Sequence, residues 1–159
     1  MRQRLIFIAT FILTVTKLPA QEAVEAGNWL KTAIEDYFAE FPPKPLTEIT
    51  SGQYAEYKQD AICVIYDCEN SLTKEQFEKK WGNIYEIEFA GYGEGFLIEQ
   101  QDWDKIVVTE CRLLKQPKEG IFIFETVLTD TDLKLTNSNE ITVVLTANGF
   151  KIDDVKKRE

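Results

Sequence analysis

The apolar residues in the first part of the chain recur with the period of a helix. Over residues 22–41 they stand three or four positions apart and so share one helical face: Ala26, Trp29, Leu30, Ala33, Ile34, Tyr37, Phe38 and Phe41. Pro42 and Pro43 follow and cannot continue a helix. The pattern predicts an amphipathic helix over residues 22–41 whose aromatic face belongs to the core.

Two more helices are predicted before the pattern changes. Residues 50–67 repeat the helical spacing, with Ser51 as the N-cap, although residues 61–66 also have the composition of a strand. The next helix is short and has its own start signal, because Thr73 and Gln76 form a capping box. Phe77 and Trp81 give it an apolar face before a Gly-Asn pair ends it.

The second half of the chain has the composition of strands. Residues 105–115, 121–128 and 141–145 are rich in Ile, Val, Leu and Phe, and residues 116–120 between the first two form a turn. Asn148-Gly149 predicts a tight hairpin into a last strand at 150–152. We expect residues 129–140 to be a solvated loop and residues 156–159 to be a frayed end. Helices followed by strands predict an α+β fold, with three N-terminal helices packed on a curved antiparallel sheet of four to five strands.

The N-terminus has the pattern of a secretory signal peptide. Arg2 and Arg4 precede an apolar run from Leu5 to Val15, and small residues follow it. The run is shorter than the roughly 20 residues that a membrane-spanning helix needs. We expect cleavage between Ala20 and Gln21, so that residues 1–20 are the signal peptide and residues 21–159 form a single exported α+β domain, periplasmic or secreted, without a membrane anchor.

Charge and composition exclude several function classes. Removal of residues 1–20 takes away three basic residues and no acidic one, so the net charge falls from −9 to −12. Such a chain is repelled by nucleic acids and by anionic lipid headgroups, and the charge serves either solubility or a cationic partner. The chain has no histidine, which excludes Ser-His-Asp and Cys-His catalysis and every zinc site that uses histidine. The composition therefore favours a protein that is not an enzyme.

Three cysteines in an exported protein raise the question of a disulfide. If Cys63 and Cys68 share a helix, they lie about 140° apart around it and do not pair. Cys111, on a predicted strand, can pair with either of them. The alternative is three small buried side chains without a bond. Their spacing does not match a zinc site, so no metal is predicted.

The order of elements and the last hairpin resemble the nuclear transport factor 2-like superfamily, in its exported and uncharacterised bacterial branch. The resemblance rests on the long first helix, the helix at residues 73–81, the strand-rich second half and the ending Phe150-Lys151-Ile152-Asp153-Asp154-Val155. Residues 95–103 also resemble the start of the sheet in such proteins. The resemblance implies a cone-shaped fold with a pocket between sheet and helices. The superfamily includes isomerases, cyclases, ligand-binding modules and protein-association domains, so the resemblance implies no single function.

One segment is the first candidate for a ligand site. Tyr92 and Trp103 offer stacking faces, Glu94 and Asp102 offer carboxylates, and the glycines between them let backbone approach a ligand. The alternative is a flexible connector followed by an ordinary turn. The glycines do not form a phosphate loop, so no cofactor is predicted.

Two acidic stretches do not have the pattern of a functional site. The acids and amides of residues 130–140 lack the spacing of a calcium loop. Asp153-Asp154, at the end of the last strand, is assigned no catalytic role.

These patterns leave three functional hypotheses. The first is an exported, non-enzymatic ligand-binding or accessory domain for an unidentified small molecule or protein partner. The second is a small isomerase- or cyclase-like enzyme with Asp102 or Glu94 as base and Tyr92 as hydrogen-bond donor. The third is an acidic inhibitor or immunity protein that binds a basic partner. A homodimer formed through the sheet is a further association that the fold class allows.

Overall fold

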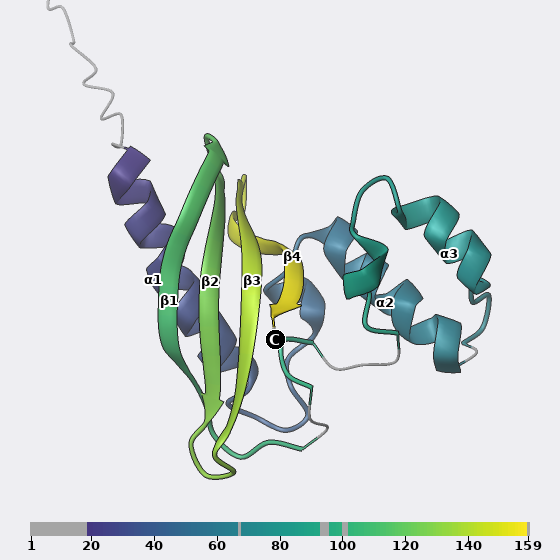
Figure 1. Ribbon diagram of the computed structural model, residues 1–159, viewed down its shortest axis with the longest axis horizontal. Helices are drawn as coiled ribbons and strands as arrows, with labels where there is room; N and C mark the ends of the chain where they lie inside the picture. The colour runs from purple at the N-terminus through teal and green to yellow at the C-terminus, as the bar shows by residue number, and fades with distance from the viewer. Residues whose placement is uncertain (1–18, 67, 93–95, 100–101, 159) are drawn as a thin grey trace, which may run out of the picture.

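Three helices precede a four-stranded antiparallel sheet, as the sequence predicts (Figure 1). The computed structural model describes residues 19–66, 68–92, 96–99 and 102–158. The helices are α1 (Pro19–Tyr37), α2 (Gly52–Tyr66) and α3 (Lys74–Trp81), with short 3-10 turns at Leu46–Glu48 and Ile87–Phe89. The strands are β1 (Ile106–Lys118), β2 (Ile121–Asp130), β3 (Leu135–Thr146) and β4 (Gly149–Arg158), which pair in chain order.

Most of the predicted signal peptide lies outside the described residues. Ala20 and Gln21, the predicted cleavage position, lie in the first turn of α1. Cleavage at this point and the single-domain organisation of residues 21–159 stay predictions. No helix in the described ranges is long and apolar enough to cross a membrane.

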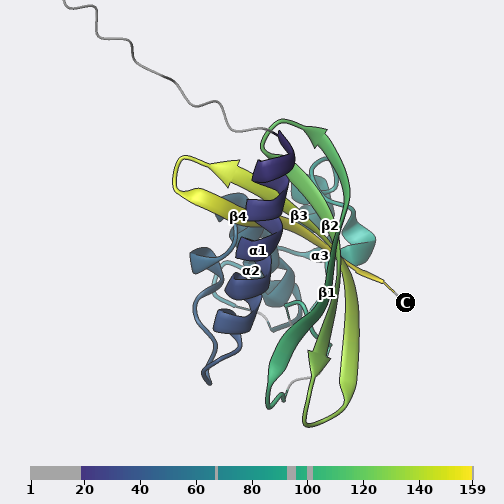
Figure 2. The same cartoon turned by 90° about the vertical axis from the view of Figure 1, so that its left-hand side faces the viewer.

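Helix α1 lies along one face of the sheet (Figure 2). Ala26, Leu30 and Ile34 on its predicted stripe are completely buried. Each buried Leu or Ile side chain contributes roughly 1.5–3 kcal/mol relative to an exposed one. The helix ends at Tyr37, earlier than predicted. Pro42 disfavours helical backbone at Phe41, the residue before it.

Side chains on β2 alternate between the two faces of the sheet. Phe122, Phe124 and Leu128 point to the α1 side and are at most 3% exposed. Ile123, Glu125 and Val127 lie on the opposite face and are half-buried. The alternation confirms a strand with one face in the core, and the packing of α1 uses that face.

The polar stretch before residue 141 is mostly strand, so the predicted loop is wrong. Residues 135–140 belong to β3, and only residues 131–134 form the turn after β2. Two polar side chains of this stretch bind the backbone of residues 97–99, which precede β1. Asn137 Oδ1 accepts from the Glu99 N–H at 2.9 Å, and Asn139 Nδ2 donates to the Leu97 carbonyl at 3.0 Å. These two side chains form hydrogen bonds with buried backbone groups instead of facing water.

The predicted frayed end is also wrong for the described residues up to Arg158. Strand β4 continues to Arg158, and Lys156 pairs in register with Glu140. Lys156 forms an ion pair with Glu86, and Arg158 forms one with Glu140. Pairing with the polar half of β3 gives this charged segment a strand partner that the sequence did not reveal.

Helices α2 and α3 lie beyond the β4 side of the sheet (Figure 1). The segment before α2 joins β4, because the Ser51 N–H donates to the Ile152 carbonyl at 2.8 Å. The Ser51 N-cap is confirmed by its side chain, which accepts from the Tyr54 N–H at 3.1 Å. The capping box of α3 is also confirmed, with Thr73 and Gln76 bonding each other's backbone N–H groups.

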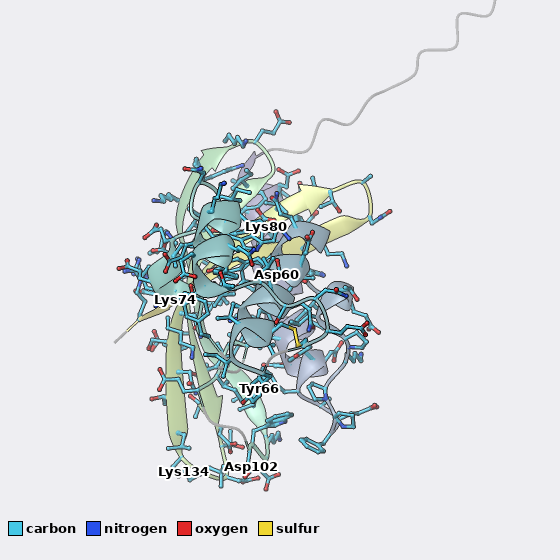
Figure 3. All side chains as sticks on the ribbon, turned by 90° about the vertical axis from the view of Figure 1, so that its right-hand side faces the viewer. Asp60, Tyr66, Lys74, Lys80, Asp102 and Lys134 are labelled. Atoms are coloured by element: carbon cyan, nitrogen blue, oxygen red, sulfur yellow. A yellow bond between two sulfur atoms is a disulfide. The ribbon has the colours of Figure 1, made fainter. Side chains whose placement is uncertain are left out.

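An ion pair and aromatic rings hold α2 and α3 together (Figure 3). Lys80 of α3 lies 2.8 Å from the Asp60 carboxylate of α2, and the Trp81 Nε1–H donates to the same carboxylate at 2.9 Å. Tyr57 packs on Phe77 with ring centroids 5.4 Å apart.

The disulfide joins Cys63 to Cys68, so the expected pairing of Cys111 is wrong. The two cysteines do not share a helix, which was the condition for keeping them apart. Helix α2 ends at Tyr66, so Cys68 lies beyond it and the two Cα atoms come within 5.1 Å. Cys111 on β1 is a free cysteine.

Candidate functional site

The described residues of the predicted ligand site pack against different helices. Tyr92 contacts Phe77 of α3, with ring centroids 5.1 Å apart, and Lys74 lies over its ring. Trp103 instead packs on Phe38 just beyond α1 and donates its Nε1–H to the Phe38 carbonyl at 3.2 Å. Both rings therefore have protein partners of their own.

The acidic members of that predicted site are not gathered around the rings. Asp102 is exposed and lies near the β2–β3 turn that carries Lys134, well apart from Lys74 in Figure 3. Glu94 lies outside the described residues. The pockets lined by described residues do not include Tyr92, Asp102 or Trp103, and a ligand site at this segment stays a prediction.

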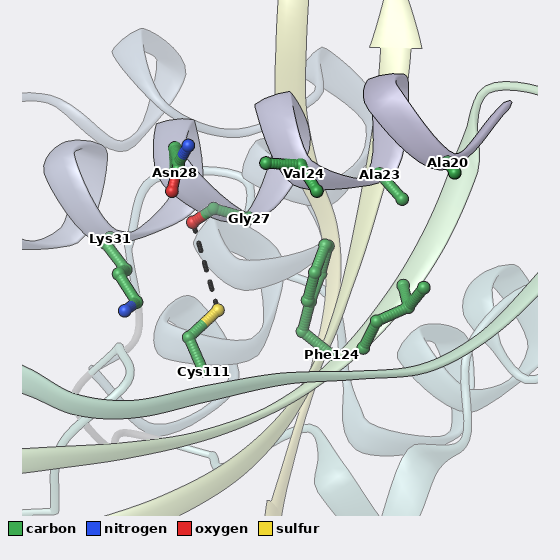
Figure 4. A pocket seen from close by; sticks show the side chains of 9 residues that line it. Ala20, Ala23, Val24, Gly27, Asn28, Lys31, Cys111 and Phe124 are labelled. Atoms are coloured by element: carbon green, nitrogen blue, oxygen red, sulfur yellow. Dashed lines mark hydrogen bonds between the residues drawn. The ribbon is translucent and has the colours of Figure 1, made fainter. Parts of the chain in front are cut away.

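A groove lies between α1 and strands β1 and β2 (Figure 4). Its volume is about 360 Å³, within the range of small-molecule sites. We name it the α1 groove. Its lining residues come from one face of α1 and from the facing strands: Ala20, Ala23, Val24, Gly27, Asn28, Lys31, Cys111, Leu113 and Phe124.

Small residues on α1 create the groove. Gly27 sits directly over Phe124, and a Cβ at this position would come within 3.1 Å of the ring. Ala23 gives the helix another short side chain on the same face. Larger side chains at these positions would fill the space between the helix and β2.

The lining of the α1 groove is mainly apolar. Val24 is 63% exposed and Leu113 is 40% exposed, so both present apolar surface at the open side of the groove. Of the lining residues only Lys31 is charged, and its side chain and that of Cys111 point toward the same space (Figure 4). The groove combines an apolar wall with one cation.

The Cys111 thiol is a wall of the groove and a poor nucleophile. Burial raises the pKa of Cys111, and the nearby positive charge of Lys31 offsets part of that rise. The Sγ lies 3.9 Å from the Gly27 carbonyl, at the outer limit of a sulfur hydrogen bond. The thiol therefore stays protonated at neutral pH, and reactions that need a thiolate are disfavoured.

The sequence shows a second helical pattern on α1, beside the bulky apolar stripe, that corresponds to this groove. Ala20, Ala23, Gly27 and Lys31 recur at three- and four-residue spacing on a face beside the bulky stripe. A run of small residues next to a bulky stripe is compatible with close helix packing as well as with a groove. Only the position of Phe124 and Leu113 across the gap separates the two outcomes.

A second cluster of interest gathers tyrosines around a carboxyl group of β4. Burial raises the pKa of Asp154 to about 6, while the positive charge of Lys156 opposes the rise. Burial and the charge of Asp154 also raise the pKa values of Tyr54 and Tyr57. The ring centroids of Tyr57 and Tyr85 lie 4.4 Å apart.

The hydroxyl groups of that cluster are poorly satisfied. The Tyr57 and Tyr85 oxygens are buried without a hydrogen bond, although the Ser51 side chain approaches Tyr85. Burial raises the pKa of Tyr85 first, and nearby Asp153 and Asp154 add to the rise. The aromatic rings fill this region, so the cluster is part of the core, and burial of its hydroxyl groups without hydrogen bonds costs stability.

Asp130 uses its carboxylate to bind backbone. It accepts from the N–H groups of Asp104 at 2.8 Å, Leu133 at 2.9 Å and Asp132 at 3.0 Å. Its burial works to raise the pKa of Asp130, but these donors outweigh burial and hold the pKa below its usual value. The acid therefore organises the β2–β3 turn and anchors the segment before β1.

Two other hollows are less suited to an apolar ligand. One, of about 390 Å³, lies beyond the C-terminal end of α1 and has Glu35, Asp36, Asp104 and Lys105 in its wall. The other, of about 260 Å³, has Asp36, Lys44 and Glu48 in its wall. Mixed charges at these positions favour water, so the α1 groove is the better candidate.

Comparisons with family models, with curated proteins and with solved structures give no match to this chain.

Proposed function

We propose that this protein is an exported, non-enzymatic ligand-binding or accessory domain that holds a small, largely apolar molecule in the α1 groove. The observation that carries the proposal is the groove itself, which has a volume of about 360 Å³ and a mainly apolar lining. Apolar walls with a few polar groups are typical of small-molecule sites. We further propose the cone-shaped arrangement of the nuclear transport factor 2-like superfamily for this fold.

Export is supported by the leader pattern at residues 1–20 and by the disulfide. Disulfides persist in oxidising compartments, and Cys63–Cys68 fits that environment. Cleavage after Ala20 would remove one lining residue of the α1 groove and keep the other eight. The proposed site therefore belongs to the mature chain.

The absence of histidine from the sequence and the protonated state of Cys111 support a binding role over catalysis. The enzyme hypothesis places the base at Asp102 or Glu94. Glu94 lies outside the described residues, and Asp102 is exposed and does not line the groove. A base at that position would have to act on a substrate held elsewhere.

Two neighbouring leucines on β1 allow a matched test of the groove. Leu113 lines it and is 40% exposed, whereas Leu114 is 39% exposed and does not line it. Binding of decanol to the exported, purified protein is measured by calorimetry, with thermal stability as a second readout. Leu113→Gln should weaken binding several-fold, and Leu114→Gln should leave it unchanged.

The outcomes separate the proposal from nonspecific binding. Equal losses in the two variants would show that decanol binds the exposed strand surface instead of the groove. No binding of decanol to the unaltered protein at concentrations up to its solubility would reject the α1 groove as an apolar site. Both variants change a partly exposed side chain, so their folding is checked by thermal unfolding without ligand.

A further inference from the structure

We infer that the α1 groove selects an amphipathic anion, a medium-chain carboxylate, whose head group binds Lys31 and whose alkyl chain lies along α1 toward Ala23. The inference rests on the proposed binding function of this groove and specifies the class of ligand. It follows from the position of one cation, the apolar path that leads away from it, and the length of that path.

The cation is at one end of the groove lining on α1. Lys31 is the last lining residue of the helix, and its side chain points to the space beside Cys111 (Figure 4). Its charge is near enough to lower the pKa of the Cys111 thiol against the effect of burial. Within the part of the chain that the structure describes, no ion pair to Lys31 is found. The ammonium group is available for a carboxylate.

The head group would have further polar neighbours at that end. Asn28 lies one helical turn before Lys31 and also lines the groove, and an amide can donate to a carboxylate oxygen. A carboxylate held by an ammonium and an amide forms charge-assisted hydrogen bonds, which are stronger than neutral ones. None of the groove-lining residues is acidic, so no lining side chain repels the anion.

The rest of the groove is suited to an alkyl chain. Ala23, Val24, Leu113 and Phe124 form its walls away from Lys31, and no charged residue lies among them. From Ala23 to Lys31 the helix rises about 12 Å at 1.5 Å per residue. An extended chain of about ten carbons covers this length. The apolar wall and the terminal cation thus fit the two ends of one molecule.

The overall charge of the protein does not favour an anionic ligand. The chain carries a net charge of −9, which repels anions in general. Preference for an anionic ligand must then come from a local cation and not from the overall field. The preference should weaken as salt is added, because an accessible charge pair is screened.

The test compares three ligands that share a ten-carbon chain and differ in the head group. Decanoate, decanol and decyltrimethylammonium are titrated below their micellar concentrations into the exported, purified protein, and affinities are measured by calorimetry. We expect decanoate to bind about tenfold more tightly than decanol, as one charge-assisted hydrogen bond would give. Decyltrimethylammonium should bind more weakly than decanol.

Variants at one position then assign the preference to a residue. Lys31→Met should make the affinities for decanoate and decanol equal. Lys31→Glu should reverse the order, so that decyltrimethylammonium becomes the preferred ligand. Lys115→Met is the matched control, because this exposed lysine of β1 does not line the groove and should keep the original order.

Each result decides one of the two proposals. If decanol binds as tightly as decanoate, or if Lys31→Met keeps the decanoate preference, the inferred ligand class is refuted while the apolar site stands. If none of the three ligands binds, the proposed function fails together with the inference. If Lys115→Met abolishes the preference as Lys31→Met does, the charge acts at long range and the assignment to Lys31 is wrong.

Discussion

Replacing Asp154 with asparagine should make the protein more stable at neutral pH, although the change removes a charged partner of Lys156. The Asp154 side chain is 19% exposed and lies 4.0 Å from the Lys156 ammonium. Burial raises the pKa of Asp154 to about 6 despite that cation. Ionisation of this buried carboxyl group at neutral pH therefore costs folding free energy. Asparagine does not ionise and avoids this cost.

The size and sign of the effect follow from linkage. An unfolded aspartate has a pKa of about 3.9, so a folded pKa of about 6 corresponds to about 3 kcal/mol at pH 7 or above. The folded state binds the proton more tightly, so this contribution to stability is fully present below pH 4. It is lost as pH rises to about 6 and is absent at higher pH. Asp153 and Glu86 add to the rise in pKa, and the tyrosine hydroxyls stay neutral in this interval.

The assay is urea unfolding of the unaltered protein and of Asp154→Asn at several pH values between 4 and 8, followed by tryptophan fluorescence. The variant should be about 2–3 kcal/mol more stable at pH 8 and nearly equal at pH 4. Asp132→Asn, at an exposed carboxyl of the β2–β3 turn, should show no such difference. A constant difference between the proteins across this range, or a less stable variant at pH 8, would refute the reasoning.

Three further substitutions test contacts that the structure assigns. Asp130→Asn should lower the free energy of unfolding in urea by about 2–3 kcal/mol, because the NH₂ group of the new asparagine must face a backbone N–H such as that of Asp104. A loss below about 0.5 kcal/mol would contradict this. Joint replacement of Cys63 and Cys68 by serine should lower the free energy of unfolding by about 2 kcal/mol, as expected for a short closed loop. A reducing agent should lower the melting temperature of the unaltered protein but not of this variant. An equal effect of the reducing agent on both proteins would argue against this bond. Thr73→Ala should cost about 1 kcal/mol by removing the cap of α3, and an unchanged midpoint of unfolding would show that the cap contributes nothing.

Local signals in the sequence were sufficient for the helices and for most strands. The capping box at Thr73, the cap at Ser51 and the hairpin at Asn148-Gly149 each involve residues within a few positions of one another. Such contacts form from local backbone geometry, which is why spacing alone located these elements. The density of Ile, Phe and Val in residues 121–128 similarly predicted the strand β2.

Two of the errors arise where a residue's partner is distant in the chain. Asn137 and Asn139 look like loop residues, yet they lie in a strand because they bind the backbone of residues 97–99. Lys156 and Arg158 look like a charged tail, but β3 and Glu86 give them partners. Polar composition cannot distinguish a group that faces water from one that binds buried backbone.

The sequence by itself determined the fold class, the starts of the second and third helices, the net charge and the lack of histidine chemistry. Only the tertiary structure decided which residues face a cavity. Tyr92 and Trp103 had the composition of a site but pack on different helices, whereas Gly27 and Lys31 had no obvious role until β1 and β2 were placed opposite them. A groove exists only where two surfaces fail to meet, and that distance is set by packing between elements far apart in the chain.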